Sequence, residues 1–136
     1  MLEAVHHVQI SIPVGGEDAA REFYCGVLGL TEIHRPEELN GLGGFWLELG
    51  GFQIHFGAED GIDRARTKSH TAYLVSDLDH WSKRLTDAGC SVLDGIQIPD
   101  LRRIEFRDPF GNRIEFLEKL NLSHRAQVRR ERTRNI

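Results

Sequence analysis

This chain of 136 residues has few cysteines and no long apolar run, and each of these features excludes a class of protein. The two cysteines, Cys25 and Cys90, have no CxxC spacing, which excludes a disulfide scaffold and a zinc ribbon. No apolar run approaches the roughly 18 residues of a membrane span. The first residues also lack the basic and then apolar pattern of a signal peptide. We therefore expect a cytoplasmic protein with no membrane partner.

Acidic residues outnumber basic residues in the chain as a whole, and the basic residues are densest at the C-terminal end. The chain has 17 Lys and Arg against 21 Asp and Glu, for a formal net charge of -4. This balance argues against a nucleic-acid partner, because phosphate neutralisation requires a clustered basic surface. From residue 119 onward, six basic residues accompany a single Glu. We interpret residues 119–136 as a basic C-terminal extension, either a fraying helix or a solvated segment, and assign it no function.

The first half of the chain contains one strand, one helix and three further strands. VHHVQISIP (residues 5–13) alternates between an apolar and a polar face, which is typical of a half-buried strand. GGEDAAREFYCGVLG (residues 15–29) places Ala19, Phe23 and Val27 at helical spacing before a Gly stop. Three extended segments follow, LTEIHR, GFWLELG and FQIHFG, each bounded by Gly, Asn or charged residues.

The same order of elements recurs in the second half. SHTAYLVSD (residues 69–77) is apolar on both faces, which predicts a central strand and places His70 in the middle of the sheet. LDHWSKRLTDAG (residues 78–89) is a helix with Leu78, Trp81 and Leu85 on one face. The last three extended segments are SVLDG, RRIEFRD and NRIEFLE.

Equivalent residues of the two halves lie 60 to 63 positions apart, as for His7 and His70 or His55 and Glu115. This internal repeat predicts an α+β fold of two βαβββ modules that form a cupped mixed or antiparallel sheet. The modules are expected at residues 4–60 and 67–118, within a single domain of residues 1–118. One helix per module covers one face of its sheet, so the other face is open.

Polar residues of unusual type gather on this predicted open face. If the apolar residues of each strand pack under the helices, the face contains His7, Gln9, His55, Arg103, Glu105 and Glu115. The face is either the solvated side of an open sheet or a functional site. A solvated strand face usually contains Lys, Thr, Glu and Ser, whereas this one has imidazoles and carboxylates at equivalent points of both modules. The residue types favour a site.

Two imidazoles and one carboxylate, those of His7, His70 and Glu115, form a set that binds a divalent first-row metal and leaves positions open for water or substrate. For either His taken alone, a hydrogen-bonded structural role is the better explanation, whereas the three residues together on equivalent strands favour a metal site. His55 is either a fourth ligand or a residue that contacts a ligand or the substrate. We expect one divalent ion, Ni, Zn, Mn or Fe, that polarises a substrate oxygen or acidifies a bound water.

Other residues of the same face are candidates for contact with a small-molecule substrate. Arg103 and Arg107 can clamp a carboxylate or phosphate, or else form a surface ladder with Glu105. Gln9 and Trp46 can contact substrate, and core packing is the alternative for Trp46. Glu115 and Glu48 are the candidate catalytic residues, because a carboxylate can move a proton.

Three motifs resemble the vicinal oxygen chelate superfamily of glyoxalase I, fosfomycin-resistance transferases, methylmalonyl-CoA epimerase, extradiol dioxygenases and bleomycin-binding proteins. They are HHVQISIP followed by FYCGVLGL, SHTAYLVSDLD before a helix that ends in AG, and RDPFGNRIEFLE. The resemblance implies paired βαβββ modules, metal ligands at His7, His70 and Glu115, and a homodimer. That family's further ligand, Glu or Gln, falls on His55, which speaks against a plain methylglyoxal–glutathione lyase.

The implied function is that of a metal-dependent enzyme of the glyoxalase or fosfomycin-resistance type. It would act on a small metal-chelating oxygenated substrate as a lyase, an isomerase or a thiol transferase. The alternative is a bleomycin-resistance-like protein that binds an antibiotic or metabolite without catalysis. The presence of the candidate metal ligands His7, His70 and Glu115 argues against this alternative. An Fe(II) extradiol dioxygenase fits less well, because those enzymes usually have four modules.

Overall fold

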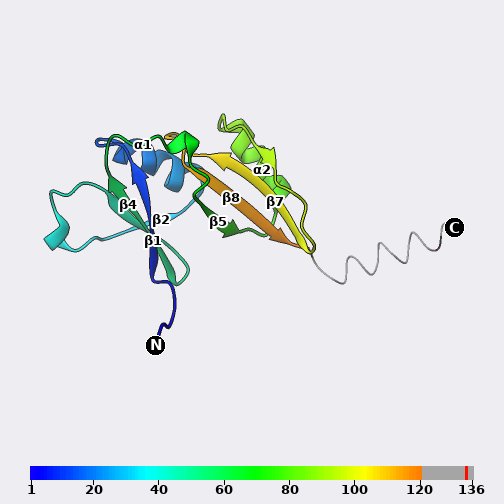
Figure 1. The fold of residues 1–136 in the computed structure, drawn as a ribbon, viewed down its shortest axis with the longest axis horizontal. Helices are drawn as coiled ribbons and strands as arrows, with labels where there is room; N and C mark the ends of the chain where they lie inside the picture. Colours follow the sequence, from blue (N-terminus) through cyan, green and yellow to red (C-terminus); the bar gives the residue numbers. More distant parts are fainter. Residues whose placement is uncertain (121–133, 135–136) are drawn as a thin grey trace. The chain divides into compact units, whose positions relative to one another are not determined.

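Two compact units make up the computed structural model, which describes residues 1–120 and 134. Unit 1 consists of residues 1–69 together with the segment Arg107–Asn112, and the described part of unit 2 contains residues 70–106 and 113–120. Each unit has a four-stranded mixed sheet (Figure 1). The order of elements is βαβββ in both, so the predicted α+β fold of two modules is confirmed.

The sheet of unit 1 has the strand order β1-β4-β3-β2. β1 (His7–Ile12) runs parallel to β4 (Phe52–Ala58), while β3 (Phe45–Leu49) is antiparallel to both β4 and β2 (Thr31–Ile33). The first and last strands of the module therefore lie side by side. The helical elements of unit 1 are α1 (Glu17–Arg21), the π-helix η1 (Glu22–Val27), and the 3-10 helices η2 (Glu37–Leu39) and η3 (Arg64–Arg66).

The sheet of unit 2 repeats this topology in the order β5-β8-β7-β6. Its elements are β5 (His70–Leu74), α2 (Leu78–Asp87), β6 (Leu93–Asp94), β7 (Leu101–Arg107) and β8 (Arg113–Lys119). β5 runs parallel to β8, which lies between β5 and β7 (Figure 1). The prediction that β5 is central in its sheet was wrong. Its second apolar face is solvated, since Leu74 is 59% exposed.

Alternation along the strands separates a core face from an open face in each unit. The core of unit 1 contains Ile10, Ile12, Phe45, Leu47, Ile54 and Phe56 from the strands, with Ala20, Phe23, Tyr24 and Leu28 from the helical segment. The core of unit 2 contains Ile104, Phe106, Ile114 and Phe116 from the strands, with Leu78 and Leu85 from α2. Each large buried side chain stabilises its unit by about 1.5–3 kcal/mol, so these contacts fix which strand face remains open.

The first helical segment differs from the expected regular helix. It changes from α1 to the π-helix η1 at Glu22, and the amide of Leu28 bonds the carbonyl of Phe23 at 3.0 Å, five residues earlier. The wider turn rotates the buried face, so Ala20, Tyr24 and Leu28 are buried beside Phe23. The predicted set was therefore only partly correct, because Ala19 is exposed.

The turn between β7 and β8 is held by a buried carboxylate. Asp108 is 5% exposed and accepts a hydrogen bond from the Tyr24 hydroxyl at 2.7 Å. It also accepts from the backbone amides of Phe110 and Asn112, both at 2.9 Å, and from the Asn112 side chain at 2.8 Å. Asn112 in turn donates to the Ser11 carbonyl at 2.8 Å. The turn is thereby fastened to β1 and to η1 within unit 1.

Beyond Leu120, the predicted basic extension lies outside the described residues, except for Arg134. Within the part of the chain that the structure describes, no helix is long and apolar enough to cross a membrane.

Removal of the Tyr24 hydroxyl tests the contribution of this network. In Tyr24→Phe the buried carboxylate of Asp108 loses one donor, and a hydrogen bond to a charged group contributes about 1.5–3 kcal/mol. Urea unfolding at neutral pH is expected to show a free energy of unfolding lower by that amount. In the double variant with Asp108→Asn, the two effects are expected to depart from additivity by at least about 0.5 kcal/mol. Strict additivity would contradict a shared network.

Candidate metal-binding half-sites

The open face of unit 1 contains the first pair of predicted ligands, His7 and His55, here called the first half-site. The parallel register of β1 and β4 places Gln9 opposite His55, so His7 lies one diagonal step from it. The two imidazole rings stack, with centroids 3.9 Å apart and an interplanar angle of 18°. His7 is exposed at the start of β1, whereas His55 is only 4% exposed.

His55 is buried because it lies between two rings. Its second face stacks on Trp46 of β3 at 3.9 Å with an angle of 2°, and its Nε2 contacts Oε1 of Gln53 at 2.9 Å. Burial, with smaller contributions from the charges of His7 and His6, lowers the pKa of His55 to about 4. His55 is therefore a neutral imidazole at pH 7, with Nε2 already engaged.

The open face of unit 2 contains the second pair, His70 and Glu115, here called the second half-site. Nε2 of His70 lies 3.0 Å from one carboxylate oxygen of Glu115. The other carboxylate oxygen accepts a hydrogen bond from Nε of Arg103. That hydrogen bond, together with the charges of Arg103 and His70, keeps the pKa of Glu115 below its usual value although the residue is 5% exposed. Glu115 is therefore ionised at neutral pH.

The two half-sites occupy equivalent positions of the two modules. In unit 2 the parallel register of β5 and β8 pairs Ala72 with Glu115, so His70 lies one diagonal step from Glu115. This is the relation of His7 to His55 in unit 1, where Gln9 takes the place of Ala72. The sequence repeat thus corresponds to a structural repeat of a first-strand His beside a last-strand ligand.

Arg103 and Arg107, predicted together as an anion clamp, lie in different surroundings. Arg103 belongs to the second half-site, and its Nη1 also donates to the Ile96 carbonyl at 3.2 Å. Arg107 is part of the turn in unit 1, where Nη1 donates to the carbonyls of Gly111 at 2.8 Å and Arg64 at 3.3 Å. The two guanidinium groups therefore do not share a partner. Glu105, the predicted member of a surface ladder, forms an ion pair with Arg113 instead.

Gln9 and Glu48 lie on the open face of unit 1. A methyl group on Gly57 would come within 2.5 Å of Nε2 of Gln9, so the Gln9 side chain lies across this glycine. Glu48 is exposed on β3, in register with Gln53 of β4 and Thr31 of β2. Trp46, on the same strand face, is half-buried against His55.

Two residues of the first half-site were missed by sequence reasoning. Gln53 lies two residues before His55, so strand alternation places both on the same face. The alternation does not predict the contact between the Gln53 side chain and the His55 ring. Strand alternation alone would place His6 and its neighbour His7 on opposite faces. β1 begins only at His7, and Nδ1 of His6 lies 2.9 Å from Nδ1 of His7.

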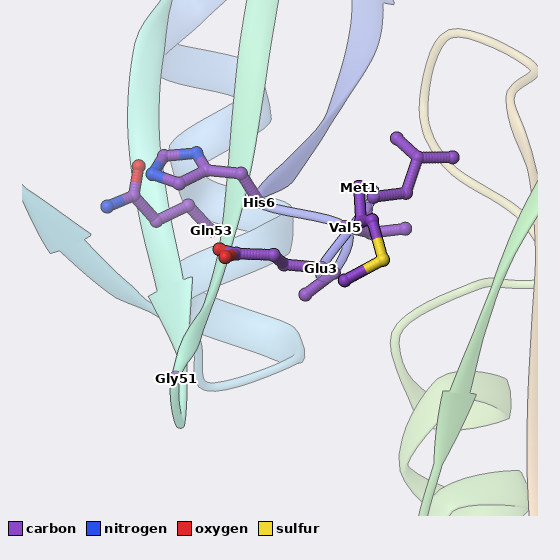
Figure 2. Close-up of a pocket in the computed structure, with 8 residues that line it drawn as sticks. Met1, Glu3, Val5, His6, Gly51 and Gln53 are labelled. Carbon is purple, nitrogen blue, oxygen red and sulfur yellow. The ribbon is translucent and has the colours of Figure 1, made fainter.

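A pocket of about 500 Å³ borders the first half-site. Residues 1–6, Gly51 and Gln53 line it, and Figure 2 shows the His6 and Gln53 side chains extending to the same side. It contains none of the predicted metal ligands. Among residues 1–120 and 134, no three His, Cys, Asp or Glu side chains form a group that could hold a metal ion. Each half-site thus offers two candidate donors, and the donor types fit a divalent first-row ion.

Residues 4–116 match the sequence model of the Glyoxalase/Bleomycin resistance protein/Dioxygenase superfamily. Comparison with curated proteins finds no match. Among solved structures, a glyoxalase family protein from Bacillus anthracis is 40% identical with a TM-score of 0.82, and the comparison covers 88% of this chain and 98% of that one.

Two more distant structures share the fold. Lactoylglutathione lyase from Agrobacterium tumefaciens is 18% identical, with a TM-score of 0.67 over 87% of this chain and 95% of that one. A mutant of the fosfomycin resistance protein FosX from Listeria monocytogenes, complexed with Mn(II) and 1S,2S-dihydroxypropylphosphonic acid, is 16% identical. Its TM-score is 0.75, over 93% of this chain and 99% of that one.

The buried neutral His55 predicts a pH dependence of stability in the metal-free protein. In the unfolded chain this imidazole binds a proton near its usual pKa of 6.5, but in the fold only near 4. Between these values the unfolded state binds more protons, so stability falls as pH falls from 6.5 to 4, by up to about 3 kcal/mol.

Urea unfolding at several pH values in this window tests the assignment. His55→Phe keeps a planar ring without a titrating group and is expected to flatten the pH dependence. His80→Gln, which removes an exposed imidazole, is the matched control and is expected to follow the native protein. An unchanged slope in His55→Phe would show that His55 is not the group responsible.

Proposed function

Because the chain belongs to the Glyoxalase/Bleomycin resistance protein/Dioxygenase superfamily, we propose that it is a metal-dependent enzyme acting on a small oxygenated molecule that chelates the ion. The reaction is that of a lyase, an isomerase or a thiol transferase. The observation that supports the proposal most is the repeated diagonal, in which His7 beside His55 corresponds to His70 beside Glu115.

In this proposal His7, His70 and Glu115 hold one divalent ion, Mn, Fe, Ni or Zn. A site needs at least three protein donors, and each half-site offers two, so both half-sites contribute. The ligands come from one chain or from the two chains of a homodimer, and both arrangements use the same residues. His55 supports His7 by ring stacking, since its Nε2 already contacts Gln53.

A bound divalent ion would polarise a substrate oxygen and stabilise negative charge that develops on it. The chain's own residues supply the remaining steps. Arg103 keeps Glu115 ionised by engaging one carboxylate oxygen. The other oxygen lies 3.0 Å from Nε2 of His70, and these two atoms would exchange their mutual contact for the ion. Glu48, exposed on the same strand face as Trp46, moves a proton to or from the substrate. Gln9 orients the substrate by hydrogen bonding from its place above Gly57.

Metal content tests the ligand set directly. Native protein is reconstituted with Mn(II), and its metal content is measured by mass spectrometry. We expect about one equivalent of Mn(II) per protein chain. Residues that only support a metal ligand change metal affinity by up to about 100-fold, and His70→Ala is expected to weaken the affinity for Mn(II) by more than this. His80→Ala is the control and is expected to keep the native affinity. Native protein that binds no divalent ion would contradict the proposal and leave ligand sequestration without catalysis as the function to test.

Glu48→Gln separates proton transfer from metal binding. The variant is expected to keep its metal, because Glu48 is not a proposed ligand, and to lose about 10²- to 10⁴-fold in turnover, the usual contribution of a general acid or base. The assay uses α-keto hemithioacetals for lyase or isomerase activity, and epoxides with a thiol for transferase activity. Turnover equal to that of the native protein, with a substrate that the native protein converts, would exclude Glu48 as the proton carrier.

A further inference from the structure

His6 lies beside the first half-site and contacts His7 through a ring nitrogen. Their Nδ1 atoms lie 2.9 Å apart and the ring centroids 5.2 Å apart, in an edge-to-face arrangement. At this separation two neutral imidazoles cannot both present a lone pair or both present a hydrogen. One Nδ1 must donate and the other must accept. The contact therefore fixes a pair of tautomers.

The direction of this hydrogen bond decides whether His7 is ready to bind a metal. With Nδ1 of His7 occupied by His6, only Nε2 remains as a metal donor, and it needs a lone pair. That lone pair exists when Nδ1 of His7 holds the proton and donates it to His6. In the opposite direction Nε2 of His7 is protonated, and the residue must change tautomer before it can bind an ion.

The ring of His7 is also fixed in orientation. It stacks on His55, which is itself held between His7 and Trp46 and engaged by Gln53 at Nε2. Stacking sets the plane of the His7 ring but does not select a tautomer, because both tautomers have the same shape. The selection depends on the edge of the ring, where His6 is the partner. Metal-binding histidines commonly donate their second N–H to a carboxylate, a backbone carbonyl or a water, and the Nδ1 of His6 occupies that position here.

We infer that His6 is a positioning residue for His7: it accepts the Nδ1–H of His7 and holds Nε2 of His7 in the unprotonated form that a metal requires. The inference rests on the proposed function for the use of that nitrogen, but the tautomer itself is a property of the metal-free protein. Sequence alternation would have assigned His6 to the opposite face. His6 can reach the His7 ring because β1 begins at His7, and His6 is therefore not bound by the alternation of the strand.

Two variants separate the hydrogen bond from the bulk of the side chain. His6→Leu removes the acceptor, whereas His6→Asn retains an acceptor oxygen close to the position of Nδ1. His6 is exposed and precedes the strand, so both variants are expected to fold, with circular dichroism spectra and melting temperatures like those of the native protein. His7→Gln identifies the His7 signals by their loss.

Two-bond proton–nitrogen NMR spectra of isotope-labelled, metal-free protein at about pH 8, where ordinary imidazoles are neutral, report the tautomer. The native protein and His6→Asn are expected to show His7 with the proton on Nδ1. His6→Leu is expected to shift His7 toward the Nε2–H tautomer, which an isolated imidazole in water favours. His7 protonated on Nε2 in the native protein, or unchanged in His6→Leu, would overturn the inference.

Titration with Mn(II) gives the second readout. His6→Leu is expected to bind about 10- to 100-fold more weakly than the native protein, the range for residues that orient a metal ligand, and His6→Asn is expected to recover most of the affinity. The two proposals fail separately. If the tautomer shifts as expected but neither the native protein nor any variant binds metal, the proposed metal site is excluded. The inference that His6 sets the tautomer of His7 is then still supported. Equal affinities in a metal-binding protein would overturn the role of His6.

Discussion

The parallel pairing of the first and last strands within each module is the constraint on which both half-sites depend. β1 pairs with β4, and β5 with β8, in registers that place a first-strand His one diagonal step from a last-strand side chain. Burial of the opposite strand faces, with Ile10, Ile54 and Phe56 in one unit and Ile114 and Phe116 in the other, prevents a slip of one residue that would invert both faces. Core packing thus sets which polar groups are presented together.

Each half-site satisfies its buried polar group in a different way. Glu115 is a buried carboxylate, which is costly unless it is paired, and Arg103 and His70 both engage it. His55 instead avoids charge: it is sandwiched between two rings and stays neutral. The first half-site therefore contains one imidazole that is held neutral, and the second contains a fixed negative charge.

Strict alternation made much of this arrangement predictable from sequence. The placement of His7, Gln9 and His55 on one face follows from the apolar partners Val8, Ile10 and Ile54, and the 60-residue repeat pointed to the second module. Features that depend on tertiary contacts were not predictable. The edge position of β5 and the bond from Arg107 to the Arg64 carbonyl arise from hydrogen bonds between distant segments. The π-helix rests on a local backbone bond from Leu28 to Phe23 that the apolar spacing does not reveal. The role of His6 depended on where β1 begins.

Electron spin echo spectroscopy of the Mn(II)-loaded protein is the most direct test of the proposed ligands His7 and His70, because the echo modulation counts coordinated imidazole nitrogens. Native protein is expected to show two such nitrogens, one from His7 and one from His70. His7→Gln and His70→Gln are each expected to show one. Two nitrogens that persist in either variant, or none in the native protein, would contradict coordination of the ion by one histidine from each module.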